Sequence, residues 1–130
     1  MGQNEQVCVH NNTRDADLAS RAWVADTFWQ RLWGLMGRRA LEPGQGLVLR
    51  RCNAIHTASM RFAIDVAYLS AQGRVVAMDH ALAPWRVGRI RRQAVHVVEL
   101  PAGTLAATAT AVGDRVSIVP GWDGEEGNDE

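Results

Sequence analysis

The chain has 130 residues, with fourteen basic and fourteen acidic side chains and a formal net charge of zero. This length is enough for one domain with its own hydrophobic core, which needs no disulfide or metal to hold it together. Its apolar runs are far shorter than the roughly 20 residues that cross a bilayer, and the polar start "MGQNEQVCVHNNTRD" has no signal-peptide core, so we expect a soluble, cytoplasmic protein without membrane contact.

Charges and cysteines are unevenly used along the chain. All fourteen basic residues are arginine, and five of the fourteen acidic residues lie in the last eight positions. Guanidinium groups suit planar anions such as carboxylate and phosphate, but the composition of a GC-rich genome would produce the same bias, and both explanations stay open. Cys8 and Cys52 have the spacing of neither a zinc site nor a redox pair, so we expect reduced thiols.

Three segments are predicted. Residues 1–16 and 121–130 lack apolar periodicity, which indicates a flexible N-terminal segment and an acidic flexible tail. Residues 17–120 form the expected single β-rich domain. It opens with a strand in "LASRAWVADT", and "DTFWQRLWGLMGRR" follows as a short amphipathic helix that begins at Asp26 or Thr27.

The rest of the domain is predicted as strands joined by turns. A short strand covers 47–49, and over 60–68 apolar and polar residues alternate, the period of a strand with one buried face. "SAQGR" turns the chain into "VVAMDHAL" as a hairpin, and "AVHVVEL" and "VGDRVSIV" are two further strands. The expected fold class is mostly β with one short N-terminal helix (α+β), in a compact barrel-like or sandwich-like single domain.

Four separated blocks occur in an order that resembles one bacterial and archaeal family. They read "RLWGLMGRRALEPGQGLVL", "IHTASMRFAIDVAYLSAQGRVV", "VVELPAG" and "VGDRV". Over residues 18–119 the chain resembles the family called domain of unknown function 192. The resemblance implies a compact β-rich single domain with a short helix, and it implies no particular activity.

The segment "IHTASMR" contains the first candidate for a functional site. His56 and Met60 are four positions apart, so they share one side in either a strand or a helix. An imidazole at the mouth of a β-domain cavity, with Thr57 and Arg61 beside it, would bind a small polar or anionic ligand. The alternative is a histidine whose ring nitrogens are satisfied by the backbone of a turn.

Two carboxylates within apolar strands, Asp65 and Glu99, need hydrogen bonds or charged partners if they are buried. Arg31 is the expected partner of either one, in a supporting role beside the ligand site. Arg61 is not expected to pair with Asp65, because four residues along a strand separate them by about 13 Å. A second hypothesis makes Asp65 and Glu99 the acid and base of a carbohydrate-active hydrolase, which requires them about 5–9.5 Å apart.

A third hypothesis rests on the arginine-rich stretch "PWRVGRIRR" at 84–92. It is a possible anion or nucleic-acid patch, since arginines beside an aromatic side chain suit single-stranded nucleic acid. Its candidate residues are Trp85, Arg86, Arg89, Arg91 and Arg92. The alternative is a solvated loop whose charge keeps a sheet edge from pairing with other chains.

Several chemistries have no support in the sequence. The chain has no lysine for a Walker motif, no G-x-S-x-G elbow and no zinc-ligand spacing among its histidines. We therefore expect no metal and no cofactor. The favoured function is a non-catalytic binding module for a small polar or anionic ligand or for a protein partner. Whether it is also an enzyme, and whether it forms oligomers, stays open.

Overall fold

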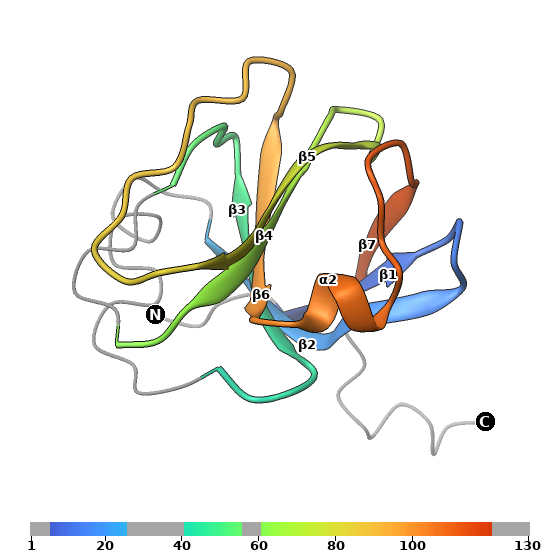
Figure 1. Ribbon diagram of the computed structural model, residues 1–130. Helices are drawn as coiled ribbons and strands as arrows, with labels where there is room; N and C mark the ends of the chain where they lie inside the picture. The colour runs from blue at the N-terminus through green and yellow to red at the C-terminus, as the bar shows by residue number, and fades with distance from the viewer. Residues whose placement is uncertain (1–5, 26–40, 56–60, 121–130) are drawn as a thin grey trace, which may run out of the picture.

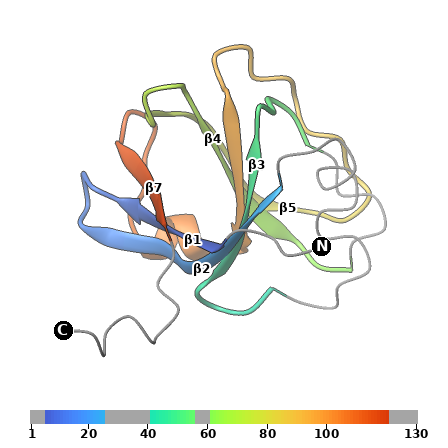
Figure 2. The same cartoon turned by 180° about the vertical axis from the view of Figure 1, so that it is seen from behind.

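The computed structural model describes residues 6–25, 41–55 and 61–120, which form one curled sheet and a short helix (Figures 1 and 2). In chain order the elements are β1 (Gln6–Asn11), β2 (Ala16–Ala25), β3 (Gln45–Arg50), β4 (Ile64–Leu69), β5 (Val75–Leu82), β6 (His96–Pro101), α2 (Thr104–Ala107) and β7 (Val116–Pro120). The strand order is β5-β4-β6-β3-β2-β1-β7, and only the β2–β3 pair is parallel. The protein is a mostly β single domain, a half-barrel. Over these residues, no helix is both long enough and apolar enough to pass through a bilayer.

The two edge strands, β5 and β7, are tied to each other where they begin. The segments that lead into them form an antiparallel bridge. The N–H of Val75 donates to the carbonyl of Asp114 at 2.9 Å, and the N–H of Val116 donates to the carbonyl of Gly73 at 2.7 Å. Gly73 has φ of 86°, and a Cβ there would lie 2.5 Å from the Val116 carbonyl oxygen. Only glycine fits at position 73. The contact gives hydrogen-bond partners to backbone groups of the two edge strands that would otherwise be exposed.

A polar network braces the β7 side of this contact. The buried Asp114 carboxylate accepts hydrogen bonds from the Asn11 amide and the Arg14 guanidinium, each at 3.0 Å, and from the N–H of Ala111 at 2.9 Å. The Arg14 and Asn11 bonds lower the pKa of Asp114 to about 2, because they stabilise the charged form. The loop before β7 is therefore fixed to β1.

Alternation along the strands separates two hydrophobic cores, one on each face of the sheet. The inner core lies within the half-barrel and comprises Val7, Val9, Leu18, Ala19, Ala22, Val24, Val48, Ala67, Leu69, Val75, Val98, Leu100, Leu105 and Val116. The outer core lies on the opposite face and comprises Ala25, Leu41, Leu47, Leu49, Ile55, Ile64, Val66, Tyr68, Ala94 and Val97. Since β4 contributes to both, all six of its residues are buried.

Asp65 closes one end of the inner core. Its side chain is fully buried and accepts three backbone N–H bonds, from Ala81 at 2.8 Å, Gly103 at 3.0 Å and Leu105 at 2.9 Å. The last two donors belong to the start of α2, whose own residues provide no side-chain cap. The strand carboxylate therefore caps the helix from across the fold, and Leu105 is held in the inner core.

Some expectations from the sequence need correction. Residues 6–11, expected to be part of a flexible end, form β1, which pairs with β2 and β7. The strand expected from 60 begins at Ile64 and is buried on both faces rather than one. The expected helix at 26–39 and the acidic tail at 121–130 lie outside the described residues. The helix that the structure does describe, α2, lies in the C-terminal region, where the N–H of Leu105 donates to Asp65.

We expect Asp65→Asn to destabilise the fold by about 2–4 kcal/mol, because the amide turns a donor toward N–H groups that need an acceptor. Urea unfolding followed by circular dichroism measures the change, and Glu42→Gln, at an exposed carboxyl, is the control. A loss below about 0.5 kcal/mol would show that Asp65 is not the capping group that holds α2.

Candidate functional site

The open end of the inner face carries polar side chains in place of apolar ones. Arg50, His96 and Leu69 are register partners on β3, β6 and β4, so they form one row across three neighbouring strands. Alternation puts this row on the same face as Val48 and Val98, which belong to the inner core. The row is therefore the rim of the half-barrel, at the end opposite Asp65.

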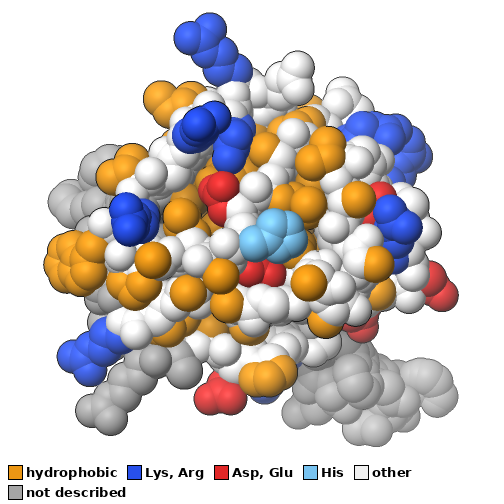
Figure 3. Space-filling view, in the orientation of Figure 1, with side chains coloured by type: hydrophobic (Ala, Val, Ile, Leu, Met, Phe, Trp, Pro, Cys, Tyr) orange, Lys and Arg blue, Asp and Glu red, His pale blue; other side chains and the backbone are white. Residues whose placement is uncertain are grey.

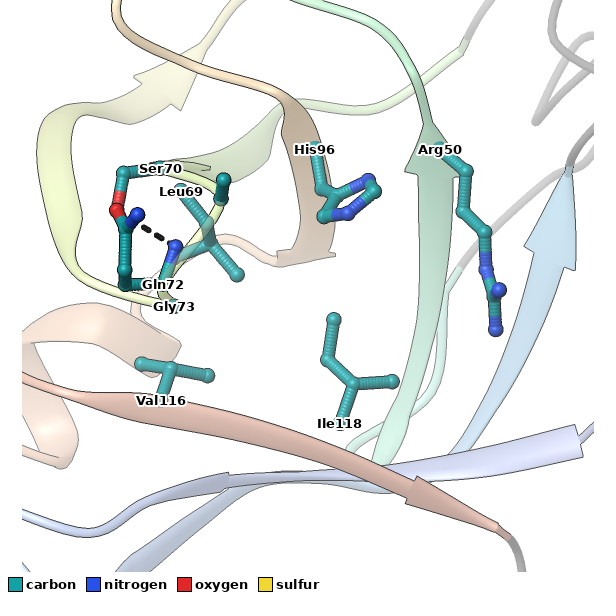
Figure 4. A pocket seen from close by; sticks show the side chains of 9 residues that line it. Arg50, Leu69, Ser70, Gln72, Gly73, His96, Val116 and Ile118 are labelled. Atoms are coloured by element: carbon teal, nitrogen blue, oxygen red, sulfur yellow. Dashed lines mark hydrogen bonds between the residues drawn. The ribbon is translucent and has the colours of Figure 1, made fainter.

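A pocket of about 290 Å³ opens beside this row (Figure 4). It is lined by Arg50, Leu69, Ser70, Ala71, Gln72, Gly73, His96, Val116 and Ile118. In Figure 4 the His96 ring lies between Arg50 and the turn at Ser70, above Val116 and Ile118 of β7. The lining thus combines an apolar floor with a polar rim, and it contains no carboxylate.

The hydrogen bonds around the rim define its chemistry. The backbone N–H of Arg51 donates to Nδ1 of His96 at 3.3 Å, so Nδ1 is the acceptor in this bond. The Ser70 hydroxyl accepts from the backbone N–H groups of Gln72 at 3.3 Å and Arg74 at 3.1 Å. Ser70 is therefore a turn-forming residue, while His96 and Arg50 bring donors to the rim.

The outer face holds a second group of polar side chains. The Tyr68 hydroxyl donates to Asp79 at 2.7 Å, and Arg91 donates to the other oxygen of the same carboxylate at 3.1 Å. The Arg91 guanidinium also lies 5.1 Å from the centre of the Tyr68 ring, within cation–π range. Burial, followed by the bond to Asp79, raises the pKa of Tyr68 well above its ordinary value. This group joins β4 and β5 to the loop before β6.

Glu99 lies in the same outer face. Leu47 and Val66 flank it in register on the neighbouring strands. Only 4% of the residue is exposed, and within 6–25, 41–55 and 61–120 its carboxyl has no hydrogen-bond or ion-pair partner. Burial raises the pKa of Glu99 to about 8, because desolvation disfavours the charged form.

The described residues include only part of the site predicted from sequence. His56, Thr57, Met60 and Arg31 lie outside the described residues, and Arg61 is exposed. Asp65 and Glu99 occupy adjacent register positions between β4 and β6, so their side chains point to opposite faces of the sheet. Neither is accessible to substrate, and the two-carboxylate hydrolase is therefore excluded by geometry.

The rim residues were missed because they are far apart in sequence and form a row only through strand register. Each of the two polar residues alternates with an inner-core residue of its strand, since Arg50 lies two positions after Val48 and His96 two positions before Val98. This alternation is the sequence signal that could have indicated them. Over the part of the chain that the structure describes, no three His, Cys, Asp or Glu side chains gather as metal ligands.

A half-barrel with an apolar interior, one end capped by a helix and a pocket with polar side chains at the other, defines a mostly β single domain. Two solved structures share the fold. One, "a putative transcription regulator" of Sinorhizobium meliloti, has a TM-score of 0.76 at 23% identity, over 89% of this chain and 94% of that one. The other, a protein of unknown function from Novosphingobium aromaticivorans, has a TM-score of 0.75 at 19% identity, over 86% and 83%.

Sequence comparison identifies the family. The DUF192 family, described as "Uncharacterized ACR, COG1430", matches residues 9–118. A UPF0127 protein of Pyrococcus furiosus is 36% identical over 82% of this chain and 93% of its own length. Another, from Pyrococcus abyssi, is 32% identical over 85% and 97%. The chain belongs to the DUF192/UPF0127 family of uncharacterised proteins, as its sequence blocks indicated.

Glu99 generates a prediction about pH. Between its ordinary pKa of 4.5 and about 8, the folded protein keeps a proton that the unfolded chain has released, so the contribution of Glu99 to stability falls as pH rises through this window. The variant Glu99→Gln cannot ionise, so its free energy of unfolding does not fall through this cause as pH rises. We expect its unfolding free energy, relative to the native chain, to rise by about 2 kcal/mol or more from pH 5 to pH 8. Urea titrations across that range measure it, and a pH-independent difference would contradict it.

Proposed function

We propose that the protein is a non-catalytic binding module for a small organic anion, which it takes up at the open end of the half-barrel. The observation that carries this proposal is the row of Arg50 and His96 above an apolar floor in a pocket without carboxylates. A guanidinium and an imidazole N–H are donors that bind carboxylate and phosphate groups through charge-assisted hydrogen bonds.

The lining of the pocket suits a ligand that has an apolar part and an anionic group. Val116 and Ile118 offer apolar surface on the β7 side, while His96 and Arg50 lie on the facing strands. A volume of about 290 Å³ is at the lower end of the range for small-molecule sites. A short branched or aromatic carboxylate or phosphate ester would fill it, with the anionic group toward Arg50.

The side chains of the lining favour binding over catalysis. Covalent catalysis requires a nucleophile with a base in hydrogen-bond reach. The one lining hydroxyl, Ser70, accepts two backbone N–H bonds within its own turn, and the lining includes no cysteine, lysine or carboxylate. Rigid walls also suit recognition, because Gly73 fixes the turn against β7.

The test uses isovalerate and phenyl phosphate as probes, with isovaleramide as the neutral counterpart of the first. We expect at least one anion to shift the backbone NMR signals of residues 50, 70–73 and 96, and isovaleramide to bind about tenfold or more weakly. Arg50→Gln should weaken binding of the anion by a similar factor, because it removes the positive charge and keeps much of the aliphatic part of the side chain.

The matched control is Arg21→Gln, at an exposed position on β2, which removes the same charge far from the rim and should leave affinity unchanged. Equal binding of isovalerate and isovaleramide, or an equal effect of both arginine variants, would contradict an anion site at this pocket. So would the absence of shifts at the rim with either anion at millimolar concentration.

A further inference from the structure

The loop of residues 83–95, between β5 and β6, is pinned to the body of the protein through its backbone. The N–H of Gly88 donates to the carbonyl of Ile55, and the N–H of Arg91 to the carbonyl of Asn53, each at 2.8 Å. Near its end the N–H of Val95 donates to Leu69 at 2.7 Å. The loop is long, but these bonds give it a defined conformation.

Side chains on the outer face of the sheet also hold this loop in place. Arg91 points inward to Asp79 and Tyr68, and its side chain is largely covered. At Gly88 a Cβ would lie 3.0 Å from the Tyr68 hydroxyl, and 3.4 Å from the Ile55 carbonyl oxygen. Glycine at this position therefore lets the loop approach the Tyr68–Asp79–Arg91 group closely.

Three large apolar side chains of this loop, next to the anchored positions, point into solvent. Trp85 is 70% exposed, Val87 83% and Ile90 69%. Trp85 also has φ of 62°, a left-handed conformation that costs free energy for a bulky residue. A pinned loop that presents apolar side chains outward, at the cost of backbone strain, marks an interaction surface.

The charge of the loop has one sign. Arg86, Arg89 and Arg92 are exposed beside the apolar side chains, and 83–95 contains no acidic residue. In Figure 3 apolar and arginine side chains alternate on the left of the molecule, where Figure 1 draws this loop. The partner must therefore offer negative charge and apolar contact together.

We propose that 84–92 is a docking surface for the anionic surface of a lipid bilayer. A protruding loop with Trp85, Val87 and Ile90 can enter the boundary between headgroups and acyl chains, while the surrounding guanidinium groups contact anionic headgroups. Nucleic acid fits less well, because Val87 and Ile90 cannot stack on bases. A protein partner would need a pocket that matches the protruding side chains, whereas a bilayer can accept them without a preformed pocket.

This surface is distinct from the pocket of the proposed function. The pocket lies at the rim of the inner face and the loop is anchored on the outer face, so either site can fail its test without affecting the other. The sequence-based expectation of no membrane contact rested on the lack of a spanning segment, and a peripheral loop needs none.

The test is co-sedimentation of the full chain with vesicles of phosphatidylglycerol and phosphatidylcholine, compared with phosphatidylcholine alone. We expect binding to the anionic vesicles only, weakened by raising NaCl from about 0.05 to about 0.5 M. Trp85→Ser combined with Ile90→Ser, and separately Arg89→Gln combined with Arg92→Gln, should each lower vesicle affinity about tenfold or more. Tryptophan fluorescence should shift to the blue on binding, and Trp85→Phe should abolish most of that shift.

Val112→Ser and Arg21→Gln are the matched controls, since Val112 is 60% exposed and Arg21 is exposed, both outside the loop. They should bind as the native chain does. Absence of vesicle binding by the native chain, or binding that the loop variants do not weaken, would overturn the proposal. Loop-dependent binding of a single-stranded oligonucleotide without vesicle binding would overturn it too, in favour of nucleic acid.

Discussion

The tie between the two edge strands is the contact on which the rest of the structure depends. Without the bonds that join Gly73 to Val116 and Val75 to Asp114, the sheet would be open at both edges, and β5 and β7 would expose unpaired backbone groups. With them, the sheet curls and its concave face becomes an interior. The inner core, the capped end and the pocket all exist because this face is enclosed.

Enclosure gives the inner face two ends with different chemistry. At one end Asp65 is fully buried and each of its oxygens accepts backbone N–H bonds, so its charge is used to hold α2. At the other end the alternating positions of β3 and β6 are Arg50 and His96, and no helix covers them in the described structure. The same strands thus carry a buried carboxylate that holds α2 at one end and a guanidinium and an imidazole at the other, so the capping group and the proposed site are at opposite ends of the inner face.

The sequence predicted the features that are local and missed those that depend on register. The β4–β5 hairpin was predicted because "SAQGR" supplies turn residues between two alternating segments, and the structure confirms it. β1 was missed because only Val7 and Val9 alternate in it, and its stability comes from β2 and β7, the latter more than 100 positions away. That Asp65 needs partners was predicted correctly, but backbone N–H groups of a distant helix cannot be recognised from sequence. The Arg50–His96 row joins residues 46 positions apart and required the register of β3 on β6.

The arginines show why residue type alone could not separate structure from function here. Within "RIRR" the side chain of Arg91 turns inward to a carboxylate and an aromatic ring, while Arg89 and Arg92 are exposed. The difference lies in the partners that the fold provides, because Asp79 on β5 and Tyr68 on β4 offer a carboxylate and an aromatic ring together at the position of Arg91. An arginine bias that arises from genome composition would scatter guanidinium groups without regard to such acceptors. Here the inward arginine sets the conformation of the loop, and that conformation decides which side chains a partner meets. The composition of the chain and the function of the loop are therefore separate questions, and the role proposed for the loop rests on the geometry of its anchors.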